Sequence, residues 1–152
     1  MADLSPGQIP LVANVPNGGV ALIQASSNTV TLGSNTNAAT AYTAGTKGGR
    51  VVSLTAVTDD TVTVNVFVFI LRGATVIPLG LVNVPVSSGN TNAARFNVDF
   101  LDSVNIVGLP LDNAGKRFIP LMPNDVLKVG ALANLTAART CWVHASGNDY
   151  QA

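Results

Sequence analysis

The chain has 152 residues and no formal net charge, and only 11% of it is charged, against roughly a quarter in a typical soluble domain. This length suits one domain, able to bury roughly two-thirds of the surface its unfolded chain would expose. A 47% hydrophobic composition excludes a disordered chain, and the lack of a basic surplus excludes a protein that binds nucleic acid through its phosphates. All acidic residues are Asp, and Val, Thr, Asn and Gly abound. Strands and turns are therefore predicted in place of helices.

The first 18 residues differ from the rest because Pro6, Pro10 and Pro16 are spaced among apolar side chains. Prolines at this density block a helix and favour an extended backbone. We therefore predict an extended arm over residues 1–18, ahead of a single β domain over residues 19–152. The arm either packs on its own domain or lies along a partner. The apolar residues that would make the partner contact are Leu4, Ile9, Leu11, Val12 and Val15.

Short strands are predicted over residues 20–24 and 29–32, with turns following them. A stronger pattern begins at Arg50, where Val52, Leu54 and Ala56 alternate with polar residues as in a half-buried strand.

The longest strand is predicted over residues 62–71. One of its faces is a row of β-branched residues, whereas the other begins polar and then carries Phe67, Phe69 and Leu71. A strand of a two-layer β protein normally has one wet face. The second face must therefore be covered by a loop, by the arm or by another subunit, and we predict a subunit interface at these three residues.

Further strands are predicted at intervals along the rest of the chain. Residues 74–86 contain Pro78 and Pro85, which places that strand at a sheet edge or makes it a broken one. The remaining segments are 93–100, 117–121, 126–132 and 140–146. Eight to ten short strands at this spacing predict an all-β fold, a single jelly-roll-like sandwich or barrel.

Cys141 and His144 are the obvious candidates for a nucleophile and its base. They lie three residues apart on a predicted strand, so their side chains face opposite ways and cannot form a hydrogen-bonded dyad. We interpret Cys141 as a small buried hydrophobe, and we expect no catalytic residues.

No cofactor or metal site is expected either. One His and one Cys cannot form a zinc site, and the Asp residues match no calcium-loop spacing. The glycine pairs fit neither the P-loop nor the dinucleotide pattern. The basic pair Lys116–Arg117 is interpreted as solvated residues flanking a turn.

Three segments resemble small β proteins encoded in the structural modules of tailed phages. Residues 41–61 are AYTAGTKGGRVVSLTAVTDDT, residues 109–127 are LPLDNAGKRFIPLMPNDVL, and residues 143–150 are VHASGNDY. The best-fitting group is the capsid decoration, or cement, proteins of siphophage-like heads, and the resemblance covers about residues 40–150.

The resemblance implies a non-enzymatic virion protein that binds the major capsid protein as a homo-oligomer, with a trimer as the expected form. It implies a place on the outer capsid surface after synthesis in the host cytoplasm. The longest apolar stretch is too short to span a bilayer, so no membrane partner is expected, and no nucleic acid is expected. Two alternatives stay open: another virion component of the tail tube, head closure or fibre, and a carbohydrate- or receptor-binding module built on Trp142, Tyr42 and Tyr150.

Overall fold

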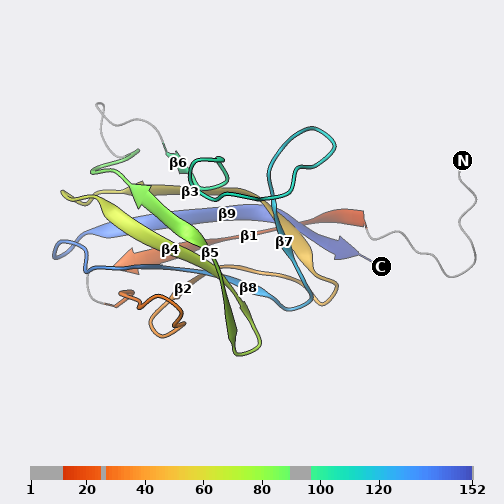
Figure 1. Cartoon of the computed structure of the whole chain (residues 1–152), viewed down its shortest axis with the longest axis horizontal. Helices are drawn as coiled ribbons and strands as arrows, with labels where there is room; N and C mark the ends of the chain where they lie inside the picture. The colour runs from red at the N-terminus through yellow and green to blue at the C-terminus, as the bar shows by residue number, and fades with distance from the viewer. Residues whose placement is uncertain (1–11, 25–26, 90–96, 152) are drawn as a thin grey trace, which may run out of the picture.

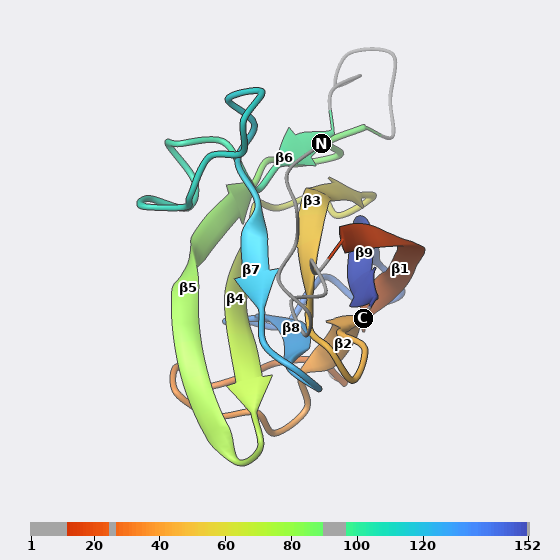
Figure 2. The ribbon, with the colours of Figure 1, turned by 90° about the vertical axis from the view of Figure 1, so that its right-hand side faces the viewer.

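The fold is a sandwich of two antiparallel sheets (Figures 1 and 2). The computed structural model describes residues 12–24, 27–89 and 97–151, and within them it has nine strands and no helix. The first sheet has the order β1 (Val12–Gln24), β9 (Thr140–Gln151), β3 (Gly49–Thr58) and β6 (Val98–Asp99), with β7 (Ile119–Leu121) also paired to β3. The second has the order β2 (Ala39–Thr43), β8 (Val126–Ala131), β4 (Val64–Arg72) and β5 (Thr75–Val84). The prediction of an all-β fold is confirmed.

Individual strands differ from the predicted ones at several places. The sequence missed β2, and it ended β9 five residues early. Residues 29–32 are not a strand, because only Thr29 forms an isolated bridge, to Ala131. Of the predicted strand 93–100, residues 93–96 lie outside the described part of the chain, and only Val98–Asp99 form β6.

The main core lies between the sheets and is built from the inward residues of every long strand. On β3, Leu54 and Ala56 point inward as predicted, but Val52 is exposed and Val51 is buried in its place. The cause is a shift of register between Val51 and Ser53 in the pairing of β3 with β9. Such an irregularity turns the side chains on one side of it to the opposite face.

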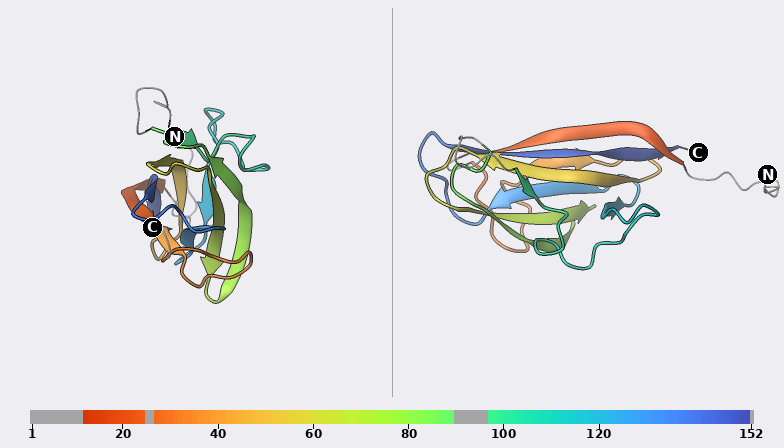
Figure 3. Two further views of the ribbon diagram at one scale, coloured as in Figure 1. Left: turned by 90° about the vertical axis from the view of Figure 1, so that its left-hand side faces the viewer. Right: turned by 90° about the horizontal axis from the view of Figure 1, so that it is seen from above.

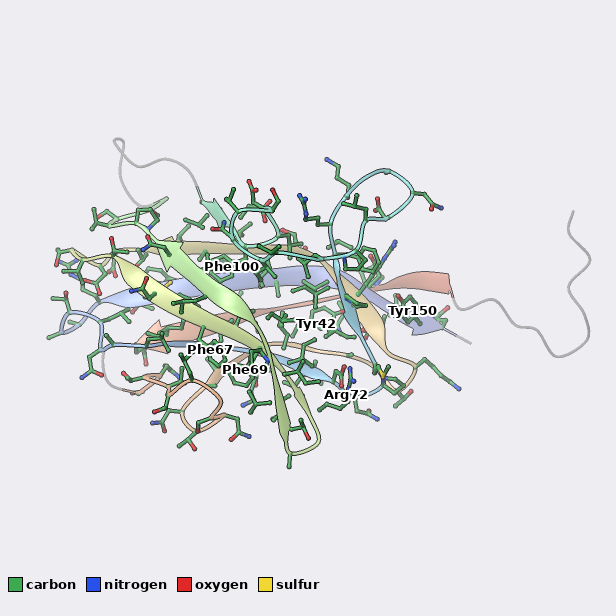
Figure 4. The ribbon with its side chains drawn as sticks, viewed as in Figure 1. Tyr42, Phe67, Phe69, Arg72, Phe100 and Tyr150 are labelled. Atoms are coloured by element: carbon green, nitrogen blue, oxygen red, sulfur yellow. The ribbon has the colours of Figure 1, made fainter. Side chains whose placement is uncertain are left out.

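A second, smaller core lies on the outer face of β4. The rings of Phe67 and Phe69 stack there with centroids 5.0 Å apart, and they are 3% and 0% exposed (Figure 4). Val30 packs on them from the segment of residues 27–38, and Leu71 is half-buried at the margin. The expectation that this face meets another subunit is therefore corrected for the two rings, because a loop of the same chain covers them.

Backbone hydrogen bonds fix this covering loop to the end of β8. Val30 N donates to Ala131 O (2.8 Å), and Ala131 N donates to Asn28 O (3.0 Å). Gly130 makes the approach possible, because a Cβ at this position would collide with the side chain of Val30. The loop is thus held against β8 by both hydrogen bonds and packing.

The prediction of an arm over residues 1–18 is wrong for residues 12–18, which belong to the sandwich. Residues from Val12 onward belong to β1 and pair with β9, and Pro16 is the register partner of Asn148. Asn17 Nδ2 and the Tyr42 hydroxyl donate to the two carboxylate oxygens of Asp149 at 2.8 and 2.9 Å. Val12 and Val15 are therefore strand residues of the domain, and Leu4, Ile9 and Leu11 lie outside the described residues.

Two buried carboxylates tie loops to the sandwich. Asp125 accepts hydrogen bonds from Arg72 Nε (2.9 Å), Arg72 Nη2 (2.8 Å) and Met122 N (2.8 Å), and the Arg72 contact chiefly lowers its pKa. Burial by itself raises the pKa of Asp60, but hydrogen bonds from Thr136 Oγ1 and N and from Val62 N outweigh burial and lower it.

The covering loop gives a first testable prediction. Replacing Phe69 by Ala should lower the free energy of unfolding by about 3–5 kcal/mol, because it removes a buried ring and leaves a cavity. The loss should not depend on protein concentration, because the cavity forms inside a single chain. Leu81→Ala, at a half-exposed position of β5, is the control and should cost far less. Chemical denaturation at several protein concentrations measures both. A loss for Phe69→Ala that grows with dilution would instead place this face between subunits.

A second prediction concerns acid. Since the pKa values of Asp60 and Asp125 are lower in the folded than in the unfolded chain, their ionised forms stabilise the fold above the unfolded value of about 4. That stability should be lost as the pH falls through the folded values. Asp125→Asn should make the unfolding free energy less dependent on pH below about 4. An unchanged pH dependence in this variant would contradict the role given to the Arg72 pair.

Candidate functional site

The most distinctive surface feature is an interruption of the strand beside β3. On that side, β7 pairs with Gly49–Val51 and β6 pairs with Thr55 and Ala56, so no described strand pairs with residues 52–54 there. Phe100 N donates to Leu54 O (2.8 Å) at one margin of the gap. Residues 100–118, which join β6 to β7, stand out from the sandwich as loops (Figures 1 and 3).

A cleft of about 730 Å³ opens at this interruption. Arg50, Val52 and Ser53 of β3 line it together with Asn148 of β9. The opposing side consists of residues that follow or belong to the interrupted strand: Asp99, Leu101, Asp102, Asp112, Gly115, Lys116 and Arg117. Of the eleven described residues that line the cleft, six are charged, in a chain that is only 11% charged. The cleft therefore concentrates the scarce charges of this protein.

The three cations of the cleft have no acidic partner within the described chain. The ion pairs found there are Arg72–Asp125 and Arg139–Asp59, neither of which involves Arg50, Lys116 or Arg117. The Arg50 guanidinium lies over the ring of Phe118, 5.9 Å from its centroid, and its buried Nε has no hydrogen-bond acceptor. Stacking of this kind holds a guanidinium in place without neutralising it.

The carboxylates of the cleft shape its loops. Asp112 Oδ1 accepts from Ala114 N (2.9 Å) and Lys116 N (2.8 Å), which closes the turn that carries Lys116 and Arg117. Asp102 Oδ1 accepts from Val104 N (3.2 Å), and Asp99 Oδ1 accepts from Leu101 N (2.9 Å). Each acid thus orients a loop with one oxygen, a common use of Asp in turns. Within the described residues, no three Asp, His or Cys side chains come close enough to hold a metal ion.

The loop after β6 also exposes two valines. Val104 and Val107 are 81% and 83% exposed, while Ile106 between them is buried. Asn105 Nδ2 donates to Asp99 O (2.6 Å), and Ile106 N donates to Asp102 O (3.1 Å), so the turn is internally braced. We call residues 104–107 the valine loop.

A second apolar surface crosses the outer face of the first sheet. Leu22 of β1, Trp142 of β9 and Val57 of β3 are register partners, so their side chains lie in one row on the same face. Val20 is half-exposed in the adjoining row, opposite His144. The row of Leu22, Trp142 and Val57 contains no Asp, Lys or Arg, whereas the adjoining row ends at Asp99 of β6, the register partner of Thr55. We call Leu22, Trp142 and Val57 the Trp142 row.

The aromatic residues considered for sugar binding do not gather in one place. Tyr42 is buried, and burial, together with its bond to Asp149, raises the pKa of its hydroxyl. Trp142 and Tyr150 are half-buried on β9, eight residues apart. At about 3.3 Å per residue, that separation is too large for one sugar platform.

Cys141 and His144 face opposite sides of β9, as strand alternation predicts. Cys141 is buried and His144 is exposed. The pKa of the Cys141 thiol is raised to about 12, mainly by burial and further by the nearby charges of Asp60 and Asp59. Because the thiolate is the nucleophilic form, this environment suppresses thiol reactivity.

Sequence reasoning missed the cleft, although it singled out the basic pair. Lys116 and Arg117 were interpreted as solvated residues beside a turn, and the turn is present. What the sequence did not reveal is that Arg50, more than sixty residues earlier, lies on the facing strand. The nearest sequence signal was the cluster of Asp99, Asp102 and Asp112 ahead of that pair.

Comparisons with protein-family models, with curated proteins and with solved structures returned no match. The decoration-protein resemblance therefore stays a prediction. In the part of the chain that the structure describes, no helix has the length and hydrophobicity needed to cross a bilayer.

The buried thiol gives a third prediction. Folded protein should react with a soluble disulfide reagent far more slowly than protein unfolded in denaturant, which should release one equivalent of chromophore promptly. Absorbance after mixing measures both rates. Prompt reaction of the folded chain would contradict the burial of Cys141.

Proposed function

We propose that the sandwich is a jelly roll. The support is the strand order, β1-β9-β3-β6 in one sheet and β2-β8-β4-β5 in the other. If β6 and β7 count as one interrupted strand, eight strands remain, and the chain changes sheets at every connection except that between β4 and β5. This is the two-Greek-key order of a jelly roll, an architecture used by capsid and lectin domains.

We further propose that this protein is a non-enzymatic structural component of a virus particle, which decorates the capsid by binding the major capsid protein as an oligomer. Fold alone does not assign a function, so the proposal depends on the surface. The observation that carries it is the uncharged Trp142 row, an apolar strip centred on a residue type that dominates many protein interfaces. The sequence resemblance adds support.

An oligomer bound to a capsid needs two contact surfaces, one for its own copies and one for the capsid. The Trp142 row is the surface proposed for the capsid protein, and the valine loop is the one proposed for a second copy. They involve different elements, since the row lies on β1, β9 and β3 while the valine loop follows β6. Apolar burial at both would account for a chain with so few charges to guide docking.

The fourth prediction tests the capsid contact. Leu22→Lys should weaken binding to undecorated capsids at least tenfold, because it places a charge where about 1.5–3 kcal/mol of apolar burial is expected. Leu81→Lys is the matched control, since Leu81 is 47% exposed against 46% for Leu22 but lies on the second sheet. Co-sedimentation with capsids gives both affinities. Equal affinities for the two variants would contradict the proposed face.

A test of the N-terminal residues requires a deletion shorter than the predicted arm. Removing residues 2–16 would also remove the first five residues of β1 and their pairing with β9. Removing residues 2–11 leaves β1 whole. If the arm contacts the capsid, this variant should keep the melting temperature of the full chain and bind capsids less tightly in the same assay; unchanged binding would exclude the arm.

A further inference from the structure

We propose that the cleft at the interrupted strand is a binding site for an acidic sugar, meaning a sugar residue that carries a carboxylate beside several hydroxyl groups. This inference goes beyond the proposed capsid role and does not depend on it. Three cations and three carboxylates line the cleft, and among the described residues none of these six forms an ion pair.

The donors of the cleft are available. Arg50, Lys116 and Arg117 come from two different walls, and none forms an ion pair with another described residue. The Arg50 guanidinium is placed by its contact with the Phe118 ring, and its Nε is buried and is not itself offered to a ligand. A guanidinium offers paired N–H groups that match the two oxygens of a carboxylate. The cations therefore favour a ligand with a carboxylate group.

The hydrogen-bond acceptors of the cleft narrow the chemical class of the ligand further. Within the described residues, Asp102 and Asp112 each accept hydrogen bonds through Oδ1 alone, which leaves Oδ2 without a donor. Sugar hydroxyls can supply such donors. A chain of closely spaced negative charges, such as an acidic peptide or a nucleic acid, would instead bring further anions toward these carboxylates. One acid group surrounded by hydroxyls fits both sets of side chains.

The volume of the cleft and its apolar lining residues are consistent with an acidic sugar. Its volume of about 730 Å³ lies in the range of small-molecule sites, which is about 300–1,000 Å³. Val52, which the register shift turns outward, and Leu101 add apolar surface between the charged groups. A sugar ring has an apolar face as well as polar edges. Recognition here would depend on charge and hydrogen bonds, because the described residues that line the cleft include no aromatic side chain.

The test is a calorimetric titration of the full chain with galacturonate, and with neutral galactose at the same concentrations. We expect galacturonate to bind and galactose to bind at least tenfold more weakly. Arg117→Gln and Lys116→Gln should each weaken galacturonate binding about tenfold, the equivalent of one charge-assisted contact. Lys47→Gln, which removes an exposed cation outside the cleft, should leave the affinity unchanged.

Several results would overturn the proposal. These are no heat of binding with galacturonate, equal affinity for galactose, or an equal loss in Lys47→Gln and Arg117→Gln, which would indicate general attraction to cations. Tighter binding of a hexaglutamate peptide would assign the cleft to an acidic protein segment instead. Melting temperatures of the variants establish that each is folded. Since no capsid is present, failure here leaves the capsid proposal standing.

Discussion

The structure depends on a strand that is apolar on both faces. β4 lies between two sets of side chains, the main core on one side and the stacked pair of Phe67 and Phe69 on the other. A sandwich strand normally leaves its outer face to water. Here the segment of residues 27–38 must fold back over that face, and Gly130 lets Val30 come close enough to cover it. Residues 27–38 of the connection between β1 and β2 thereby become part of the packed structure.

The edge of the first sheet, beside β3, is the second feature that shapes the surface. An edge strand with unpaired backbone groups invites association, and short or interrupted edge strands are one way in which proteins limit it. Among the described strands, β6 and β7 leave a gap beside β3, and six described charged residues line the cleft there. Elsewhere on the same sheet the Trp142 row carries no charge. On β3 the cleft is lined by Arg50, Val52 and Ser53, and the Trp142 row lies further along the strand at Val57.

Local patterns in the sequence predicted the all-β class and most strand positions, because alternation and turn residues are local properties. The apolar second face of β4 was also visible, but its cover was not, since residues 27–38 carry only a weak strand pattern. Val52 was assigned inward because a register shift leaves no mark in the sequence. The cleft could not be predicted because it joins Arg50 to Lys116 and Arg117 through long-range strand pairing.

The central claim is that this chain works by binding to a particle through an apolar sheet face. An electron cryo-microscopy reconstruction of the virion tests it most directly. The account predicts density for a two-layer β sandwich over the head shell, with Leu22 and Trp142 against the major capsid protein. Density confined to the tail, or a sandwich on the head whose Trp142 row faces solvent, would contradict it.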